Sequence, residues 1–214
     1  MTAGPATMPP DPPNPFNPLA FTLPAGEVAY RMHENRFRTT EFNPGPKGAG
    51  RFHFFGDPMV SVLYAAETEA AAVGEILLRN IPGGGGQVSY GDYQKKVMAA
   101  IETRRDIRLA SFLGDDCRAL RVLPEQLTGP GETSYPQTRK WAAAAYEAGF
   151  EGIAWMSKRS PRYQAYMFFG DRVSESDFAV VPGSARIFAA GPDQDWLIEH
   201  CGLMHIDVLP APIT

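Results

Sequence analysis

Short apolar runs alternate with polar loops along the chain, and the spacing inside each run predicts its secondary structure. Runs that are rich in aromatic and β-branched residues are typical of strands. We predict strands over residues 27–33, 50–56, 60–67, 95–103, 107–112, 152–156, 164–170, 185–189 and 204–209. These strands occur in clusters and do not alternate regularly with helices, which favours an α+β fold over a doubly wound sheet.

Two segments have the composition and the ends of stable helices. Residues 68–80 are alanine-rich, and Thr68 is a suitable N-cap. Residues 138–150 form the second predicted helix, which ends at Gly149 as a glycine C-cap would. A shorter helix is expected over residues 193–200, between the last two strands.

The domain organisation is simple. The chain has 214 residues, enough for one well-packed domain, and no internal linker divides it. Residues 1–24 are proline-rich and are predicted to be an extended or disordered leader, with a single catalytic domain over residues 25–214. The start lacks the basic and apolar regions of a signal peptide, and no run is long enough to span a membrane. We therefore expect a cytoplasmic protein that does not enter a membrane.

The charge and the cysteine content narrow the class of partner. A net charge of −4 argues against a surface that binds nucleic acid, which usually carries a basic stripe. Cys117 and Cys201 are too few for a disulfide framework and are expected to be buried free thiols. A local basic pocket remains compatible with this composition.

Several polar side chains lie within or beside apolar runs, where each needs a partner once it is buried. They are Arg31 in YRMH, Arg51 in GRFHFF, Tyr64 in VLYAAE, Glu75 in AVGEILL and Ser157 in GIAWMSKR. Two guanidinium groups, a carboxylate, a phenol and a hydroxyl suit an anionic ligand that carries a sugar. We interpret them as the walls of a dinucleotide pocket.

Two kinds of hydrolase are disfavoured. Ser157 lacks the GxSxG turn that exposes a nucleophilic serine. Glu67, Glu69 and Glu75 are clustered along one predicted helix and the residue just before its N-cap, so they do not place two acids on opposite sides of a sugar.

Metal and phosphate-loop chemistry are disfavoured as well, and no prosthetic group or metal is expected. His200, Cys201 and His205 match neither HExxH nor a CxxC zinc pattern. The glycines at 83–86 are not followed by Lys-Ser or Lys-Thr, and a flexible connector is the simpler interpretation.

Cleavage of NAD at its nicotinamide–ribose bond fits the remaining set of side chains. Nicotinamide is already a good leaving group, so the protein need not supply an acid. Arginine binds diphosphate oxygens bidentately, and one glutamate can bind a ribose hydroxyl and stabilise the developing cation. Tyrosine can stack on the nicotinamide, and serine can position a phosphate or an attacking group. The set is sufficient for this reaction but not unique to it.

At these residues the chain resembles the RES-domain family, the toxins of bacterial RES–Xre toxin–antitoxin pairs, named for an Arg, a Glu and a Ser. The matching stretches span about residues 27 to 175 and are YRMH, GRFHFFGDPMVSVLYAAET, AAAVGEILL, YPQTRKWAAAAYEAGFEGIAWMSKR and QAYMFFG. The resemblance implies a single α+β domain with a mixed, strongly twisted β core and flanking helices, similar to the ADP-ribosyltransferase toxins.

The resemblance also implies roles for individual residues. Glu75, Arg31 and Ser157 would be the catalytic residues, with Glu75 as the catalytic carboxylate. The residues that bind NAD would be Arg31, Arg51, Tyr64, Ser157 and Arg159.

The implied substrate is NAD, with phosphate as a candidate co-substrate, so that the enzyme would be an NAD phosphorylase. Water as acceptor would make it a glycohydrolase, and a protein acceptor would make it an ADP-ribosyltransferase. A non-catalytic binding module on the same scaffold is a further alternative. The implied protein partner is an Xre-type helix-turn-helix antitoxin, and a homodimer is a candidate assembly.

Structural roles remain open for each of these side chains. Ser160 competes with Ser157 for the family serine, and Arg162 competes with Arg159. Arg31 could form a structural salt bridge, and Arg51 could cap the end of a strand. Tyr64 could simply pack in the core, and Glu75 could be a solvated helix residue. His33 and His53 flank the two arginines and are candidate ligand contacts.

Overall fold

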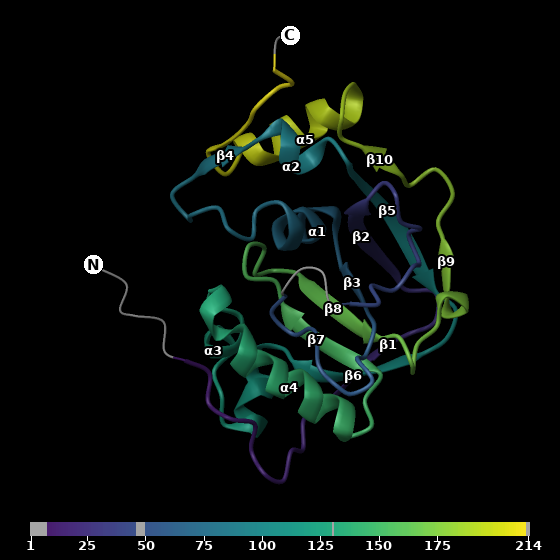
Figure 1. The fold of residues 1–214 in the computed structure, drawn as a ribbon, viewed down its shortest axis with the longest axis vertical. Coiled ribbons are helices and arrows are strands. Elements are labelled where there is room, and N and C mark those ends of the chain that lie inside the picture. Colours follow the sequence, from purple (N-terminus) through teal and green to yellow (C-terminus); the bar gives the residue numbers. More distant parts are fainter. Residues whose placement is uncertain (1–7, 46–49, 130, 213–214) are drawn as a thin grey trace.

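The computed structural model describes residues 8–45, 50–129 and 131–212 and shows one mixed α+β domain (Figure 1). The strands are β1 (Ala20–Leu23), β2 (Val28–Glu34), β3 (Val62–Ala66), β4 (Gly86–Val88), β5 (Lys96–Thr103), β6 (Ile107–Phe112), β7 (Gly152–Met156), β8 (Gln164–Phe169), β9 (Phe178–Val180), β10 (Arg186–Ile187) and β11 (Ile206–Val208). The helices are α1 (Glu69–Ile76), α2 (Tyr90–Tyr93), α3 (Pro124–Thr128), α4 (Tyr135–Glu147) and α5 (Pro192–Gly202), with 3-10 turns η1 (Gly114–Leu120), η2 (Glu132–Ser134) and η3 (Glu175–Asp177).

In the described part of the chain, nine strands form one mixed sheet. Its order is β1-β6-β7-β8-β3-β2-β5-β10, and β9 also pairs with β5. Strands β6 and β7 run parallel, whereas β2, β3 and β8 are joined by antiparallel pairing. Strands β4 and β11 form a separate parallel pair. The α+β fold with a mixed sheet and flanking helices is therefore confirmed.

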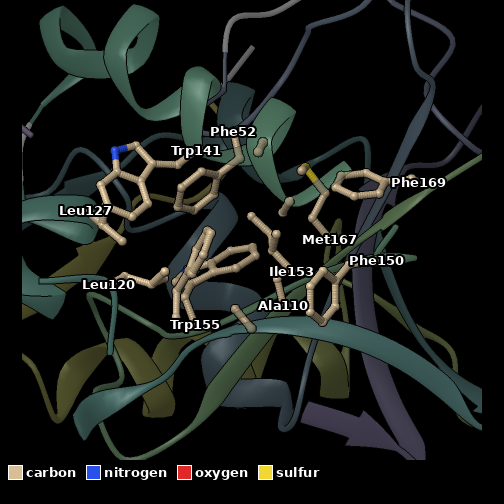
Figure 2. Close-up of a cluster of buried hydrophobic side chains, with 14 of the residues drawn as sticks. Phe52, Ala110, Leu120, Leu127, Trp141, Phe150, Ile153, Trp155, Met167 and Phe169 are labelled. Atoms are coloured by element: carbon tan, nitrogen blue, oxygen red, sulfur yellow. The ribbon is translucent and has the colours of Figure 1, made fainter. Parts of the chain in front are cut away.

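Among the described residues, two of the three buried apolar clusters lie between the sheet and a group of helices. Helix α4 covers strands β6 to β8, and Trp141, Ile153, Trp155 and Met167 pack together there (Figure 2). Helices α1 and α5 lie toward the β2–β5 end of the sheet (Figure 1), where Met32, among others, is buried in a second cluster. Strands β3 and β8 join the two halves, so the space beside α1 opens next to both clusters.

The helix boundaries follow the predicted caps. Thr68 is the N-cap of α1, and its hydroxyl accepts a hydrogen bond from the Ala71 N–H at 3.3 Å. Gly149 follows α4 with a φ of +85°, the left-handed conformation that glycine adopts without steric cost. Helix α1 ends at Ile76, before the predicted end at residue 80, and α4 begins three residues before the predicted start at 138.

The strand predicted over residues 50–56 is wrong. The segment forms a loop in which Gly56 has a φ of +88° and the Val60 N–H donates to the Phe55 carbonyl. Its aromatic content reflects packing instead of strand pairing, because Phe52 is fully buried 5.1 Å from the Trp155 ring (Figure 2). Aromatic enrichment alone therefore did not distinguish a strand from a core-filling loop.

Several elements lie outside the predicted ones. Strand β1 lies inside the segment predicted as a leader and pairs antiparallel with β6. Pro10 is also anchored, because its carbonyl accepts a hydrogen bond from the Trp141 indole at 2.8 Å. Residues 1–7 of the predicted leader lie outside the described residues. Helices α2 and α3 occupy short segments that were predicted as loops or left unassigned.

No helix in the described ranges is both long enough and apolar enough to cross a membrane.

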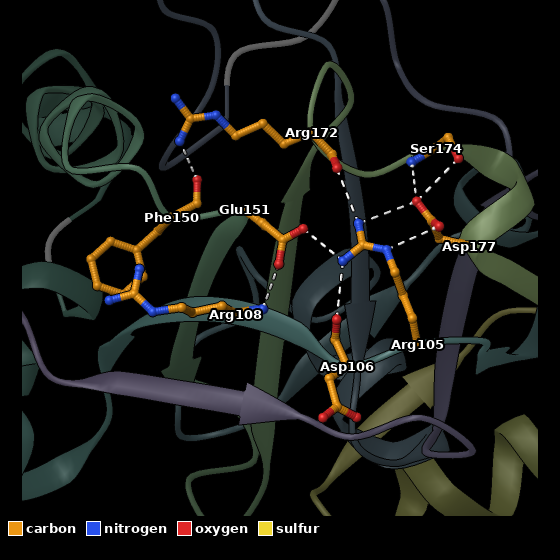
Figure 3. A network of polar contacts seen from close by, with 8 residues as sticks. All are labelled: Arg105, Asp106, Arg108, Phe150, Glu151, Arg172, Ser174 and Asp177. Atoms are coloured by element: carbon orange, nitrogen blue, oxygen red, sulfur yellow. Dashed lines mark hydrogen bonds and ion pairs between the residues drawn. The ribbon is translucent and has the colours of Figure 1, made fainter.

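An arginine in the turn after β5 connects three segments of the chain (Figure 3). Arg105 donates to Glu151 at 2.6 Å, to Asp177 at 3.0 Å and to the Arg172 carbonyl at 3.1 Å. The two carboxylate side chains are 23% and 22% exposed, so both ion pairs are largely shielded from water. Charge-assisted hydrogen bonds in such surroundings contribute more than exposed pairs. The network therefore links the turn after β5 to η3 and to Glu151, the residue just before β7.

We expect Arg105→Ala to lower the free energy of unfolding by about 1 kcal/mol, because two shielded carboxylates lose their partner. Urea unfolding followed by circular dichroism measures the change. Arg118→Ala is the matched control, since Arg118 and its partner Asp115 are 76% and 94% exposed. The control should change stability by less than about 0.5 kcal/mol, and equal effects of both variants would contradict the importance of the network.

Candidate functional site

A cavity of about 210 Å³ opens between the β2–β3 face of the sheet and helix α1. Four of the predicted site residues line it, and they come from four separate segments of the chain. These residues are Arg31, Arg51, Tyr64 and Glu75. The structure thus gathers one carboxylate, two guanidinium groups and one phenol around a single space.

The carboxylate of Glu75 is held by two residues that do not line the cavity. Its Oε1 accepts hydrogen bonds from the Ser157 hydroxyl at 2.7 Å and from the Lys158 N–H at 3.2 Å. Ser157 is fully buried and does not line the cavity. Among the described residues, no group donates to Oε2 of Glu75. Ser157 therefore orients the carboxylate from outside the cavity.

This contact depends on a close approach between α1 and the loop after β7. A Cβ on Gly74 would lie 3.1 Å from the Arg159 Cβ and 3.3 Å from the Ser160 hydroxyl, so glycine leaves the necessary room. The Ser160 N–H also donates to the Ser157 hydroxyl oxygen at 3.3 Å. Ser160 itself contacts the Ala70 carbonyl and makes no contact with Glu75. The geometry therefore favours Ser157 over Ser160 as the serine of the site.

Arg31 presents a buried positive charge to the cavity. It lies in the middle of β2 opposite Ala99 of β5, and only 8% of its surface is exposed. Its Nη1 donates to the Thr39 carbonyl at 2.6 Å. Burial lowers the pKa of the guanidinium to about 10, although the negative charges of Glu41 and Glu175 act in the opposite direction. The side chain stays protonated at neutral pH and provides a cation for an anionic ligand.

Arg51 also lines the cavity, where residues of α3 and α4 hold it. Its Nη1 donates to the Leu127 carbonyl at 3.0 Å, and its guanidinium lies 5.5 Å from the centre of the Tyr135 ring. The Arg51 carbonyl accepts a hydrogen bond from the Thr138 hydroxyl. Burial lowers the pKa of this guanidinium too. Its backbone and side chain are thus both fixed by residues from the region of α3 and α4.

Aromatic side chains complete the wall. The Tyr64 hydroxyl lies 2.7 Å from Nδ1 of His53, and its ring meets Trp155 edge to face at a centroid distance of 5.9 Å. Burial raises the pKa of Tyr64, so its hydroxyl keeps its proton. Its orientation is set by His53, which also lines the cavity.

Among the other lining residues, Trp155, Tyr135 and Arg79 were not singled out as site residues from the sequence. Trp155 lies in β7, and its local sequence does not distinguish it from a tryptophan of the core. Tyr135 lies before the predicted start of the helix at residue 138, and nothing in its local sequence indicated a pocket.

Arg159 lies away from this cavity. Its Nη2 donates to the Arg79 carbonyl at 2.9 Å, and it lines a separate space of about 260 Å³ beside Ile81 and Lys158. Arg159 therefore lines this second space and not the cavity that contains Glu75.

No cluster of three or more His, Cys, Asp or Glu side chains with metal-binding geometry occurs among the described residues.

The α+β domain thus places two guanidinium groups, a fixed carboxylate and aromatic rings around one cavity. The RES domain family model matches residues 28–189, and the chain belongs to this family. All six predicted site residues fall inside the matched range.

Solved structures support the same fold. A chain in the crystal structure of the M. tuberculosis MbcT–MbcA toxin–antitoxin complex is similar, with a TM-score of 0.55. The match covers 77% of this chain and 85% of that chain at 11% sequence identity. No curated protein matches the chain.

Burial of Arg31 without an ion-pair partner among the described residues should reduce the stability of the free protein. We expect Arg31→Met to raise the free energy of unfolding by about 1 kcal/mol, because replacing a buried charge by an apolar group of similar volume is often stabilising. The cost of the charge should be present below pH 10. It should diminish as the pH rises from about 10 toward the ordinary arginine value, because the unfolded state binds the proton more tightly.

Urea unfolding at neutral pH measures this difference. Arg36→Met is the matched control, because the Arg36 side chain is 65% exposed and its removal should leave stability nearly unchanged. If Arg31→Met were less stable than the wild type, the Arg31 guanidinium would instead stabilise the fold.

Proposed function

We propose that this RES-domain protein is a toxin-type enzyme that consumes NAD by cleaving its nicotinamide–ribose bond. The observation that carries the proposal is the oriented carboxylate of Glu75, which faces a cavity lined by Arg31 and Arg51. A carboxylate beside one buried and one partly buried guanidinium group matches a ligand with one developing positive centre and a separate diphosphate. NAD in its cleavage transition state has both.

The proposed reaction begins with departure of nicotinamide. The C–N bond to the ribose breaks, and its electron pair stays on the nicotinamide nitrogen, which neutralises the pyridinium charge. The ribose carbon then acquires oxocarbenium character, and the negative charge of Glu75 stabilises it. Because Ser157 and Lys158 already hold Oε1, Oε2 is available for a ribose hydroxyl. No acid is required for this leaving group.

The remaining side chains would bind and orient the dinucleotide. Arg31 and Arg51 would bind the diphosphate, since guanidinium groups recognise phosphate oxygens through paired donors. Tyr64 and Trp155 offer ring surfaces near Glu75 for the nicotinamide. His53 would keep the Tyr64 hydroxyl in one orientation.

The acceptor completes the reaction. In phosphorolysis, an oxygen of inorganic phosphate forms the new bond to the ribose carbon and gives ADP-ribose 1-phosphate. In hydrolysis, water attacks, a proton is lost to solvent and ADP-ribose forms. A protein acceptor would make the same step an ADP-ribosyl transfer. We favour phosphate, on the resemblance described above.

The biological setting is part of the proposal. The fold similarity to a chain of a toxin–antitoxin complex supports an antitoxin as partner. We propose an Xre-type helix-turn-helix protein in this role and a cytoplasmic location, where NAD depletion would arrest growth. A second copy of this chain remains a candidate partner.

The direct test is release of nicotinamide from NAD by the purified protein, with and without phosphate. We expect release, and Glu75→Gln should lower kcat by roughly a hundredfold or more, because it removes preorganised charge at the reacting carbon. An unchanged melting temperature would show that the variant is folded. Wild-type rates from Glu75→Gln would exclude Glu75 from the chemistry.

Mass spectrometry of the products separates the alternatives. ADP-ribose 1-phosphate indicates phosphorolysis, ADP-ribose indicates hydrolysis, and label retained on a macromolecule indicates protein modification. Stabilisation by NAD without any nicotinamide release would instead indicate a binding module.

The role of Ser157 gives a second kinetic prediction. Ser157→Ala should lower kcat roughly tenfold or more, because Glu75 loses a hydrogen bond to a charged group, while KM for NAD stays nearly unchanged. Ser160→Ala is the matched control and should retain wild-type kinetics within about twofold, since its hydroxyl does not reach Glu75. A larger loss in the Ser160 variant would assign the role to Ser160.

A further inference from the structure

A second, larger cavity adjoins the one that contains Glu75. It has a volume of about 640 Å³ and shares Arg31 and Asn43 with the smaller cavity. The turn after β2 and the segment leading to Asn43 supply the rest of its wall, including Phe37 and Glu41. The two spaces therefore meet at the buried guanidinium of Arg31.

The sizes of the two cavities indicate that a bound dinucleotide would occupy both of them. Sites for drug-sized ligands usually have volumes of about 300–1,000 Å³, so the 210 Å³ cavity is too small for a whole dinucleotide. The reacting nicotinamide–ribose end must lie beside Glu75. With the diphosphate at Arg31, the other half of the molecule would extend into the larger cavity.

The larger cavity carries a surface suited to a purine. Phe37 is 39% exposed, although it is a large apolar side chain. The guanidinium of Arg36 lies 4.7 Å from the centre of the Phe37 ring, and Arg36 is itself held by Glu34 at 2.7 Å. Nucleobases stack on aromatic rings and on guanidinium planes. Arg36 thus packs over the Phe37 ring, and the two side chains form an aromatic–guanidinium stack at the wall of the cavity.

A carboxylate of the same cavity can recognise the polar groups of a nucleoside. Oε2 of Glu41 accepts a hydrogen bond from the Arg38 N–H at 3.0 Å, which fixes the side chain at the cavity wall. A carboxylate accepts hydrogen bonds from ribose hydroxyls or an exocyclic amino group. Together with the stacked Phe37 and Arg36, Glu41 offers both stacking and hydrogen bonding.

We infer that the larger cavity is the subsite for the adenosine half of the dinucleotide, with the adenine stacked on Phe37. This inference rests on the proposed function for the identity of the substrate. It assigns specificity to a part of the chain that lies away from Glu75. The protein would then distinguish NAD from nicotinamide mononucleotide, which lacks the adenosine half.

The test compares two substrates and two variants. Phe37→Ala should raise KM for NAD roughly five- to a hundredfold, the range expected for loss of one base-stacking contact. Its KM for nicotinamide mononucleotide should not change, and kcat for NAD should stay close to that of the wild type. Phe37→Trp keeps an aromatic surface and should retain the low KM for NAD. Phe37 is partly exposed, so thermal melting should show both variants folded.

A titration with ADP measures the subsite without the reaction. Calorimetry should show that Phe37→Ala weakens ADP binding by the same factor, whereas Ile198→Ala, a partly exposed control on α5, leaves it unchanged. Equal ADP affinity of the wild type and Phe37→Ala, or equal use of NAD and nicotinamide mononucleotide by the wild type, would overturn the subsite. Phe37-dependent ADP binding without nicotinamide release would support the subsite and refute the proposed reaction.

Discussion

The close approach of helix α1 to the loop after strand β7 is the constraint on which the site depends. Gly74 leaves room for this loop, and Ser157 then reaches Glu75 across the gap between the two elements. A carboxylate on a short helix would otherwise be free to turn toward solvent. Because its orientation is fixed, the Glu75 carboxylate lines the same cavity as the two neighbouring guanidinium groups.

The second determinant is burial of positive charge. Arg31 and Arg51 come from different segments, and burial lowers the pKa of both guanidinium groups. Such groups are costly in the folded protein unless a ligand supplies negative charge. Stability and ligand recognition are therefore opposed at these positions, as is common where a site is prepared before its ligand arrives.

Much of this architecture is predictable from local sequence. Thr68 and Gly149 mark helix ends through capping chemistry, which needs no tertiary information. The polar residues within apolar runs pointed to the cavity because a buried polar group requires a partner. The loop around Phe52 was predicted wrongly, since its aromatic residues fill the core without strand pairing. The placement of Arg159 and Tyr135 depends on contacts between distant segments, which no local pattern contains.

The order of these segments along the chain has a consequence for synthesis. Glu75 and Ser157 are separated by 82 positions, and strand β7 must be present before the serine can reach the helix. A growing polypeptide on the ribosome thus contains both arginines and the glutamate well before the carboxylate can be oriented. Products of premature termination before β7 carry an unassembled site, so the proposed activity would arise only late in translation.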